Sequence, residues 1–225
     1  MSTWAKENYF ENGTEEISNA LIAEIDSLRA KHSITPDFDK MAFLVMDFQK
    51  AYLDPDAASS IPAAKEVVDN IKSLINKFPD NLFIFTRHLN TKEDAGNFKK
   101  WWRKILTKED PESELFFSPG QNTVVLEKTR YDAFYDTKLE EVLKKNEIKQ
   151  LVMVGTMTNL CCESTARSAF DRGFEVFYLV DAMATRNLVL HQASVYSAAH
   201  GFAYPLTTAE FLKLREEIED AANLS

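Results

Sequence analysis

Six short apolar runs alternate along the chain with longer segments whose apolar residues recur at helical spacing. The runs are apolar throughout rather than at every second position, which is typical of strands buried on both faces. They cover residues 41–47, 81–88, 123–128, 150–156, 174–182 and 202–208. The helical segments cover residues 62–78, 97–106, 136–146, 159–172, 187–200 and 208–222. Strands that alternate with helices predict an α/β fold in three layers, with a parallel six-stranded sheet flanked by helices.

The segment before the first strand predicts one extra helix. Its sequence, "TEEISNALIAEIDSLRAKHS" at residues 14–33, is amphipathic, and Asn12 and Glu15 are spaced as a capping box at its start. Its apolar face consists of Ile17, Leu21, Ile22, Ile25 and Leu28. We expect this helix to pack on the domain or on a neighbouring subunit, as a helical arm at residues 1–37 ahead of a single domain at residues 38–225.

The composition is that of one soluble globular domain, with 225 residues of which 45% are hydrophobic and 27% charged. The net charge of −9 argues against a nucleic acid or an anionic membrane as partner, because phosphate binding requires an excess of Lys and Arg. No apolar run approaches the roughly 20 residues of a membrane-spanning helix, and neither end resembles a signal segment. The sequence therefore predicts a cytoplasmic protein.

The only two cysteines, Cys161 and Cys162, are neighbours. Cytoplasmic thiols stay reduced, and a disulfide between adjacent residues would close a strained ring, so we expect no structural disulfide. A metal site is also not expected, because the two cysteines and four histidines show no ligand spacing of the CxxC or HxxxH type. Either both cysteines are ordinary small hydrophobes, or one of them is a nucleophile.

Three reactive side chains follow predicted strands. Asp47 ends the first strand, Lys128 ends the third, and Cys161 comes after the fourth at the start of a helix. Ligands of open parallel sheets bind beyond the carboxyl ends of the strands, so these groups are expected to converge. The N–H groups and positive dipole of a helix N-terminus favour a thiolate at Cys161. Cys162 points about 100° away around the helix and is expected to pack as a small hydrophobe.

Each of these groups has a structural explanation when taken alone, since an aspartate after a strand is often a turn residue and a lysine there usually reaches solvent. Together they have the chemistry of acyl transfer. A carboxylate takes the proton of a thiol, an ammonium stabilises the thiolate, and N–H groups at the turn into a helix stabilise an oxyanion. Such a site needs no histidine.

Four segments carry a resemblance to a known family: "LVMDFQKAYL", "LEKTRYDAFYDTKLEEVL", "GTMTNLCCESTARSAF" and "FEVFYLVDAMAT". In this order they resemble the isochorismatase-like cysteine hydrolases over about residues 38–212. The resemblance implies a Rossmann-like sheet with Cys161 as nucleophile, Asp47 as general base and Lys128 as the cationic member of a triad. It also implies an oxyanion hole built from the backbone N–H groups of Met157 and Cys161, after a cis peptide bond between Thr156 and Met157.

The retained thiol favours hydrolysis of a C–N bond, in a small amide, carbamoyl or ureido compound, over the vinyl-ether hydrolysis of isochorismatases, which lack this cysteine. The resemblance further implies a homo-oligomer, either a dimer or a tetramer, that needs no cofactor. The residues expected to bind substrate are Gln49, Tyr52, His88, Trp102, Tyr131, Phe134 and Asn159.

The sequence departs from the family pattern after the second strand. Nicotinamidases of this family have a metal-binding Asp and His in a pattern like "TxDxH", whereas this chain reads "TRHLN", with His88 and Asn90 in those places. The resemblance is therefore to a metal-free branch, and nicotinamide is not the expected substrate. Of Trp101 and Trp102, one is expected to line the site, and we choose Trp102. Asp132 is expected either to favour a cationic substrate or to meet solvent.

Three other functions remain as alternatives. One is ether hydrolysis of the isochorismate type with Asp47 as the acid, and another is a non-catalytic interaction protein that keeps the fold. The third is a nucleotide-binding α/β domain, which lacks support because no strand ends in a GxGxxG or Walker-type loop.

Overall fold

The sheet has the predicted architecture. The computed structural model describes residues 5–102, 104–120 and 122–223. A single six-stranded sheet, in the order β3-β2-β1-β4-β5-β6, has parallel pairing at every neighbour. Its strands are β1 Met41–Met46, β2 Leu82–His88, β3 Thr123–Lys128, β4 Gln150–Thr156, β5 Glu175–Ala184 and β6 Tyr204–Leu206.

The helices follow the predicted alternation, with differences in length. They are α1 Glu15–Glu24, α2 Asp26–Arg29, α3 Lys50–Leu53, α4 Val68–Lys77, α5 Phe98–Trp101, α6 Leu139–Lys145, α7 Glu163–Asp171, α8 Leu188–Gly201 and α9 Thr208–Asn223. The helix expected at 97–106 is only the single turn α5, because Trp102 takes an extended backbone; residue 103 lies outside the described residues. The helix expected at 62–78 is divided into a 3₁₀ turn, Pro62–Lys65, and α4.

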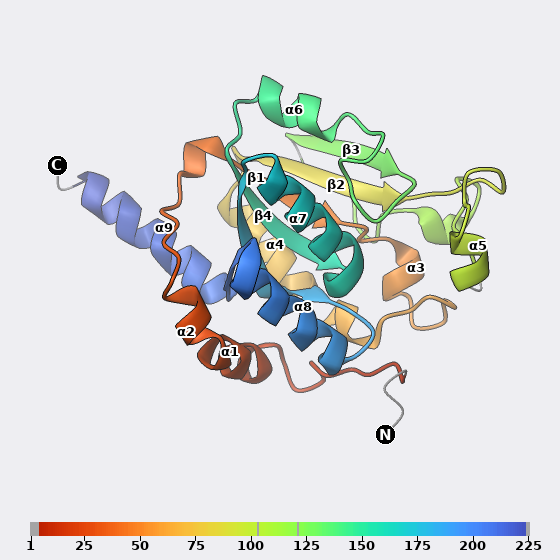
Figure 1. Cartoon of the computed structure of the whole chain (residues 1–225), viewed down its shortest axis with the longest axis horizontal. Helices are drawn as coiled ribbons and strands as arrows, with labels where there is room; N and C mark the ends of the chain where they lie inside the picture. The colour runs from red at the N-terminus through yellow and green to blue at the C-terminus, as the bar shows by residue number, and fades with distance from the viewer. Residues whose placement is uncertain (1–4, 103, 121, 224–225) are drawn as a thin grey trace.

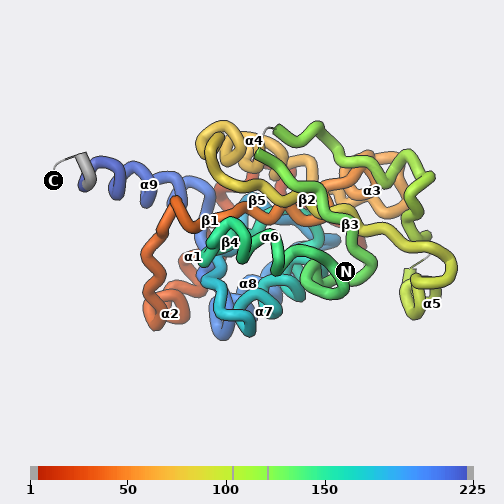
Figure 2. Tube along the Cα trace, turned by 90° about the horizontal axis from the view of Figure 1, so that it is seen from above, coloured from red at the N-terminus to blue at the C-terminus, as the bar shows by residue number. Residues whose placement is uncertain are grey.

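The helices form one layer on each face of the sheet, as Figures 1 and 2 show. Apolar residues of α1, α6, α7 and α8 pack in one core cluster with one face of the strands. The residues of α3, α4 and α9 pack in a second cluster on the opposite face. Neighbouring strand positions such as Leu44 and Val45 belong to different clusters. Both faces of the strands are therefore buried, which explains why the runs are apolar without alternation.

The N-terminal arm packs against the domain. Leu21, Ile22 and Ile25 belong to the same core cluster as residues of α7 and α8. The arm forms two helices rather than one, because the backbone leaves helical geometry at Ile25 between α1 and α2. The predicted capping box is wrong: α1 starts after Thr14, and no side chain caps it. The proposed boundary between residues 37 and 38 stays a prediction.

The chain order brings the chemistry to one edge of the sheet. From β1 the chain runs outward through β2 to β3, and then returns to the other side of β1 to form β4, β5 and β6. Gly155, near the end of β4, has φ +108°, and a Cβ there would lie 2.3 Å from the carbonyl oxygen of Met46. Glycine therefore allows the turn after β4 to lie close to the end of β1, where Asp47 follows.

Candidate active site

Asp47 is fixed at the end of β1 by hydroxyl groups from both neighbouring strands. Its backbone is in the left-handed region, with φ +42°. Its N–H donates to Thr86 Oγ1 at 2.9 Å, and the same hydroxyl donates to the Asp47 Oδ1 at 2.6 Å. Thr156 Oγ1 donates to the Asp47 carbonyl at 2.9 Å. Sequence reasoning missed both threonines, although a hydroxyl residue inside an apolar strand is a signal for such a role.

Lys128 brings the three predicted catalytic groups together. Its side chain is fully buried, and its Nζ lies 2.7 Å from Asp47 Oδ2 and 3.2 Å from Cys161 Sγ. The same ammonium donates to the Arg130 carbonyl at 2.9 Å and lies 3.4 Å from His88 Nδ1. The ammonium therefore contacts both the carboxylate and the sulfur, which is the convergence that the strand ends predicted.

The protonation of Cys161 in the site without substrate differs from the expectation based on the sequence. Burial and the neighbouring Asp47 raise the pKa of Cys161, and Lys128 only partly opposes them. Burial alone would raise the pKa of Asp47, but Lys128 and then His88 lower it. Burial also opposes the charge of Lys128, yet Asp47 and Cys161 raise its pKa. The resting site is thus an Asp47–Lys128 ion pair beside a neutral thiol, and the expected thiolate is wrong for this state.

Cys161, the predicted nucleophile, lies in the π-helical turn η4, Thr158–Cys162 (the nucleophile turn below), which leads directly into α7. The peptide bond between Thr156 and Met157 is cis, as the resemblance implied. The carbonyl of Met157 accepts from the N–H groups of Leu160 at 3.0 Å and Cys162 at 3.2 Å. Cys162 is completely buried among core residues, where it packs as the predicted small hydrophobe, while the sulfur of Cys161 contacts Lys128.

Comparison with known proteins identifies the family. The Isochorismatase domain model matches residues 41–210. This chain belongs to the isochorismatase family. It is 37% identical over 177 residues to "Nicotinamidase 3" of Arabidopsis thaliana, covering 75% of this chain and 85% of that protein. It is 28% identical to "Ureidoacrylate amidohydrolase RutB" of Caulobacter segnis, covering 76% of this chain and 83% of that protein.

A solved structure agrees with this assignment. The chain superposes on a cysteine hydrolase from Pseudomonas syringae pv. phaseolicola with a TM-score of 0.78 and 25% identity, covering 82% of this chain and 96% of that chain. Two of these relatives are named for the hydrolysis of amides, and the solved structure is called a cysteine hydrolase. None of the helices in the described part of the chain is long and apolar enough to cross a membrane.

The metal site of some isochorismatase-family proteins does not fit the residues present here. Donor atoms of Asp47, His88 and Cys161 lie within 4.8 Å of one another, but the Lys128 ammonium already contacts all three groups. His88 Nε2 donates to Asn90 Oδ1 at 3.0 Å, so both of its ring nitrogens are engaged. Burial and then Lys128 lower the pKa of His88 to about 4, which keeps the ring neutral at pH 7.

Aromatic side chains from α5, from its C-terminal end and from the loop after β3 lie near His88. Trp102 Nε1 donates to the Tyr131 hydroxyl at 2.9 Å. The Phe98 ring lies 5.1 Å from the His88 ring and 5.0 Å from the Tyr131 ring. Trp101, by contrast, is 78% exposed. Of the two tryptophans, Trp102 is therefore the one that faces the predicted site, and Phe98 is an aromatic neighbour that sequence reasoning missed.

Three other predicted substrate-binding residues lie at the same edge of the sheet. Tyr52 is close enough to the triad that, after burial, Asp47 and Cys161 are the main causes of its raised pKa. Gln49 accepts from the His88 N–H at 2.8 Å and donates to a backbone carbonyl at 2.8 Å, so its amide joins β2 to the loop at residues 113–115. Asn159 accepts from a threonine hydroxyl at 2.6 Å. Their contacts with substrate stay predictions.

Phe134 and Asp132 have structural roles in the described chain. The Phe134 ring is buried and stacks on Phe174 at 6.1 Å, with the Arg172 guanidinium 4.6 Å from its centre. That position in the core corrects the expectation that Phe134 lines the substrate site. Asp132 accepts from the Phe134 N–H at 2.8 Å and from the Ser168 hydroxyl at 2.8 Å. Both carboxylate oxygens are used within the fold, which explains the residue without a cationic substrate.

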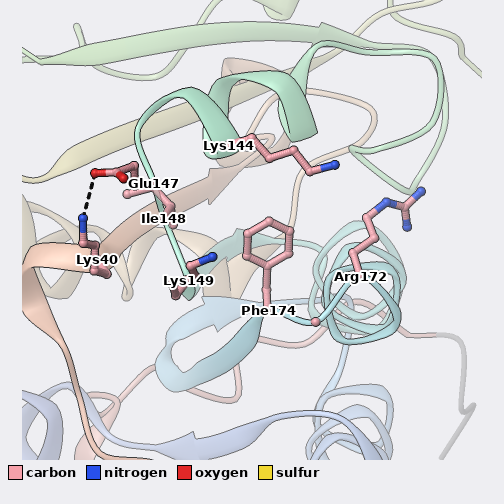
Figure 3. Close-up of a pocket in the computed structure, with 8 residues that line it drawn as sticks. Lys40, Lys144, Glu147, Ile148, Lys149, Arg172 and Phe174 are labelled. Atoms are coloured by element: carbon pink, nitrogen blue, oxygen red, sulfur yellow. Dashed lines mark hydrogen bonds and ion pairs between the residues drawn. The ribbon is translucent and has the colours of Figure 1, made fainter.

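A pocket of about 370 Å³ lies at the opposite end of the strands (Figure 3). It is rich in cations, but Lys40 pairs with Glu147 at 3.0 Å, and Lys144 and Arg172 both pair with Glu140. Lysine and arginine are also favourable at the carboxyl ends of helices such as α6 and α7. Among the described residues that line the pocket, none was predicted for the site. The pocket is therefore separate from the triad.

Proposed function

We propose that this member of the isochorismatase family hydrolyses a C–N bond of a small amide, carbamoyl or ureido compound through a thioester on Cys161. The observation that carries the proposal is the position of the Lys128 ammonium, 2.7 Å from the carboxylate of Asp47 and 3.2 Å from the sulfur of Cys161. A thiol, an ionised carboxylate and a fixed positive charge in contact provide a nucleophile, its base and an electrostatic support.

In the acylation step, Asp47 takes the proton of the Cys161 thiol while the sulfur attacks the carbonyl carbon of the substrate. The new C–S bond places a negative charge on the carbonyl oxygen. The backbone N–H groups of Met157 and Cys161 are the proposed donors to this oxyanion. The intermediate collapses with cleavage of the C–N bond, and the leaving nitrogen takes the proton from Asp47.

In the deacylation step, a water molecule attacks the carbonyl carbon of the thioester and gives a proton to Asp47. The C–S bond breaks, the sulfur recovers its proton from Asp47, and the acid leaves. One water is consumed for each C–N bond cleaved, and the site returns to its neutral thiol and ion pair. In the resting site Lys128 is charged, because Asp47 and Cys161 raise its pKa against the effect of burial.

The names of two relatives suggest substrates to test. One is called a nicotinamidase and another a ureidoacrylate amidohydrolase. We expect ammonia release from a ureido or carbamoyl acid and not from nicotinamide, because His88 and Asn90 hydrogen-bond each other where metal-dependent nicotinamidases have ligands. A panel of both compounds with simple aliphatic amides, assayed for ammonia, would test this choice. Turnover of nicotinamide alone would overturn it.

The matched pair Cys161→Ala and Cys162→Ala tests the nucleophile. We expect the first variant to lose turnover and the second to keep most of it, because only the Cys161 sulfur contacts Lys128. Mass spectrometry of the quenched wild-type enzyme should find the acyl group on the peptide at Cys161. Turnover of a vinyl ether without any acyl group on Cys161 would favour vinyl-ether hydrolysis with Asp47 as the acid. A well-folded wild type that turns over neither class of substrate would favour the non-catalytic protein.

We also propose a cytoplasmic location and, from the resemblance, a homo-oligomer. The oligomer is expected to be a dimer or a tetramer. Light scattering after size-exclusion chromatography measures its mass directly, and a monomer of 25.7 kDa would contradict the proposal.

A further inference from the structure

The N-terminal segment ahead of α1 contacts the loop that follows β5. It lies outside residues 41–210, which match the family model. The Glu7 N–H donates to the Arg186 carbonyl at 2.9 Å, and the Glu7 carboxylate accepts from the Leu188 N–H at 3.3 Å. The Tyr9 hydroxyl accepts from the Thr185 N–H at 2.9 Å. The segment is thus held against the same edge of the sheet that carries the triad.

A short chain of hydrogen bonds connects this segment to the nucleophile turn. Tyr9 accepts from the backbone of Thr185, and the Thr185 hydroxyl donates to Asn159 Oδ1 at 2.6 Å. Asn159 belongs to η4, two residues before Cys161. Tyr9 and Thr185 are buried, so these bonds are shielded from competing water. A change at Tyr9 is therefore transmitted to η4 through only one intervening residue.

A second connection runs through His191 on α8. The rings of Tyr9 and Phe10 lie 5.4 Å and 5.8 Å from the His191 ring. His191 Nδ1 is hydrogen-bonded to Thr158 Oγ1 at 3.0 Å, and the Thr158 carbonyl accepts from the Tyr178 hydroxyl at 2.7 Å. Thr158 is the first residue of η4. The N-terminal segment therefore supports two consecutive residues of the turn, one by packing and one by hydrogen bonds.

We propose that Tyr9 is a positioning residue, which holds η4 so that the Cys161 sulfur stays against Lys128 and Asp47. The proposal rests on the proposed function, since it concerns the same nucleophile. Displacing a reacting group by about 1 Å can cost on the order of 100-fold in rate. The N-terminal segment, which the family model does not cover, is then part of the catalytic apparatus of this chain rather than a separate arm.

Tyr9→Phe is the direct test, because it keeps the ring against His191 and removes only the acceptor for Thr185. We expect kcat to fall by about 10-fold with KM changed less than about 2-fold, since the reacting atoms and not substrate binding are disturbed. Tyr196→Phe is the matched control. It removes a tyrosine hydrogen bond of 2.6 Å to Glu24, which also joins the N-terminal arm to α8 but lies away from η4, and it should retain wild-type kcat.

Thr185→Val breaks the next bond in the chain by removing the hydroxyl that reaches Asn159. It should give a similar loss of kcat, and the double variant with Tyr9→Phe should lose little more than either single variant, because both act through one connection. Fully additive losses would contradict that connection.

Alkylation of Cys161 by iodoacetamide provides a readout that does not depend on substrate. Because the Cys161 sulfur lies between Asp47, which raises the pKa of the thiol, and Lys128, which lowers it, a displaced turn should change the pH profile of alkylation in Tyr9→Phe and leave it unchanged in Tyr196→Phe. An unchanged alkylation profile in Tyr9→Phe would overturn the positioning role. So would a loss of kcat that only follows the unfolded fraction in thermal denaturation. If no amide proves to be a substrate, the proposed function fails, while the alkylation comparison still decides the role of Tyr9.

Discussion

Replacing Lys128 with methionine is expected to destabilise the fold and to lower turnover by orders of magnitude. The side chain of Lys128 is completely buried and pairs with the equally buried Asp47 at 2.7 Å. Methionine has a similar length, so the substitution removes the charge with little change in packing volume. It leaves the carboxylate of Asp47 in the protein interior, with the Thr86 hydroxyl but without the ammonium.

The expected cost follows from the loss of one partner of a buried ion pair, which is typically about 3–5 kcal/mol of unfolding free energy. For a chain of 225 residues, each kcal/mol corresponds to about 2–4 °C in Tm, so Tm should fall by roughly 6–20 °C at pH 7. Loss of the proton-transfer arrangement should lower kcat by about 10²–10⁴-fold. Urea denaturation and a thermal scan, beside an ammonia assay, measure the two effects separately.

The difference in stability between the wild type and Lys128→Met should depend on pH, because the pKa of Asp47 differs between the two proteins. In the wild type, Lys128 is a principal cause of the lowered pKa of Asp47, so the ion pair contributes stability above the unfolded pKa of about 3.9 and loses it as pH falls through the folded value. In Lys128→Met, burial without a cation raises the folded pKa of Asp47, which makes the carboxylate costly at neutral pH. The stability difference between the two proteins should therefore shrink as pH falls from 7 toward 4.

The double variant Lys128→Met/Asp47→Asn is the control. It removes both charges, so it should recover most of the lost stability while remaining inactive. The reasoning is refuted if Lys128→Met unfolds within about 1 kcal/mol of the wild type at pH 7, or if its deficit persists unchanged in the double variant. Either result would show that the buried pair contributes little to the fold.

Two further predictions concern metal and acid. Activity should survive dialysis against EDTA, because the Lys128 ammonium lies among the donor atoms of Asp47, His88 and Cys161; a loss that zinc restores would contradict this. Burial lowers the pKa of both His88 and His191 to about 4, against about 6.5 in an unfolded chain. Each buried neutral ring therefore contributes stability that is complete above pH 6.5 and lost as pH falls toward 4, on the order of 3 kcal/mol for each histidine. Urea denaturation of the wild type between pH 7 and 4.5 measures this decline, and a flat profile would refute it.

The sheet could be predicted from the sequence because strands that are buried on both faces are apolar at every position. The run at residues 41–47 is apolar at every position before Asp47, and the structure buries all of β1. The sequence pattern does not show that helix α5 is short. Residues 97–106 have helical spacing, but Trp102 leaves the helix and donates its indole N–H to Tyr131. A contact with a residue distant in sequence decides where this helix ends.

The same distinction holds for the site. The convergence of Asp47, Lys128 and Cys161 could be predicted, because parallel strands deliver their following residues to one edge. The place of Phe134 could not, because its position after β3 does not reveal that the ring turns into the core against Phe174. The roles of Thr86 and Tyr9 also depend on which side chains meet across the sheet, which the order of residues along the chain does not specify.

The protonation of Cys161 was mispredicted for a reason that bears on the proposed mechanism. A helix N-terminus favours a thiolate when the sulfur is solvated, but here burial and an adjacent carboxylate favour the neutral thiol. The site already contains one negative charge, on Asp47, and one positive charge, on Lys128. In the proposed mechanism, transfer of the proton to Asp47 therefore becomes favourable only as the negative charge passes from sulfur to the carbonyl oxygen of the substrate. The proposed N–H donors at Met157 and Cys161 must receive that charge, so the geometry of the η4 turn governs both the nucleophile and the oxyanion that it creates.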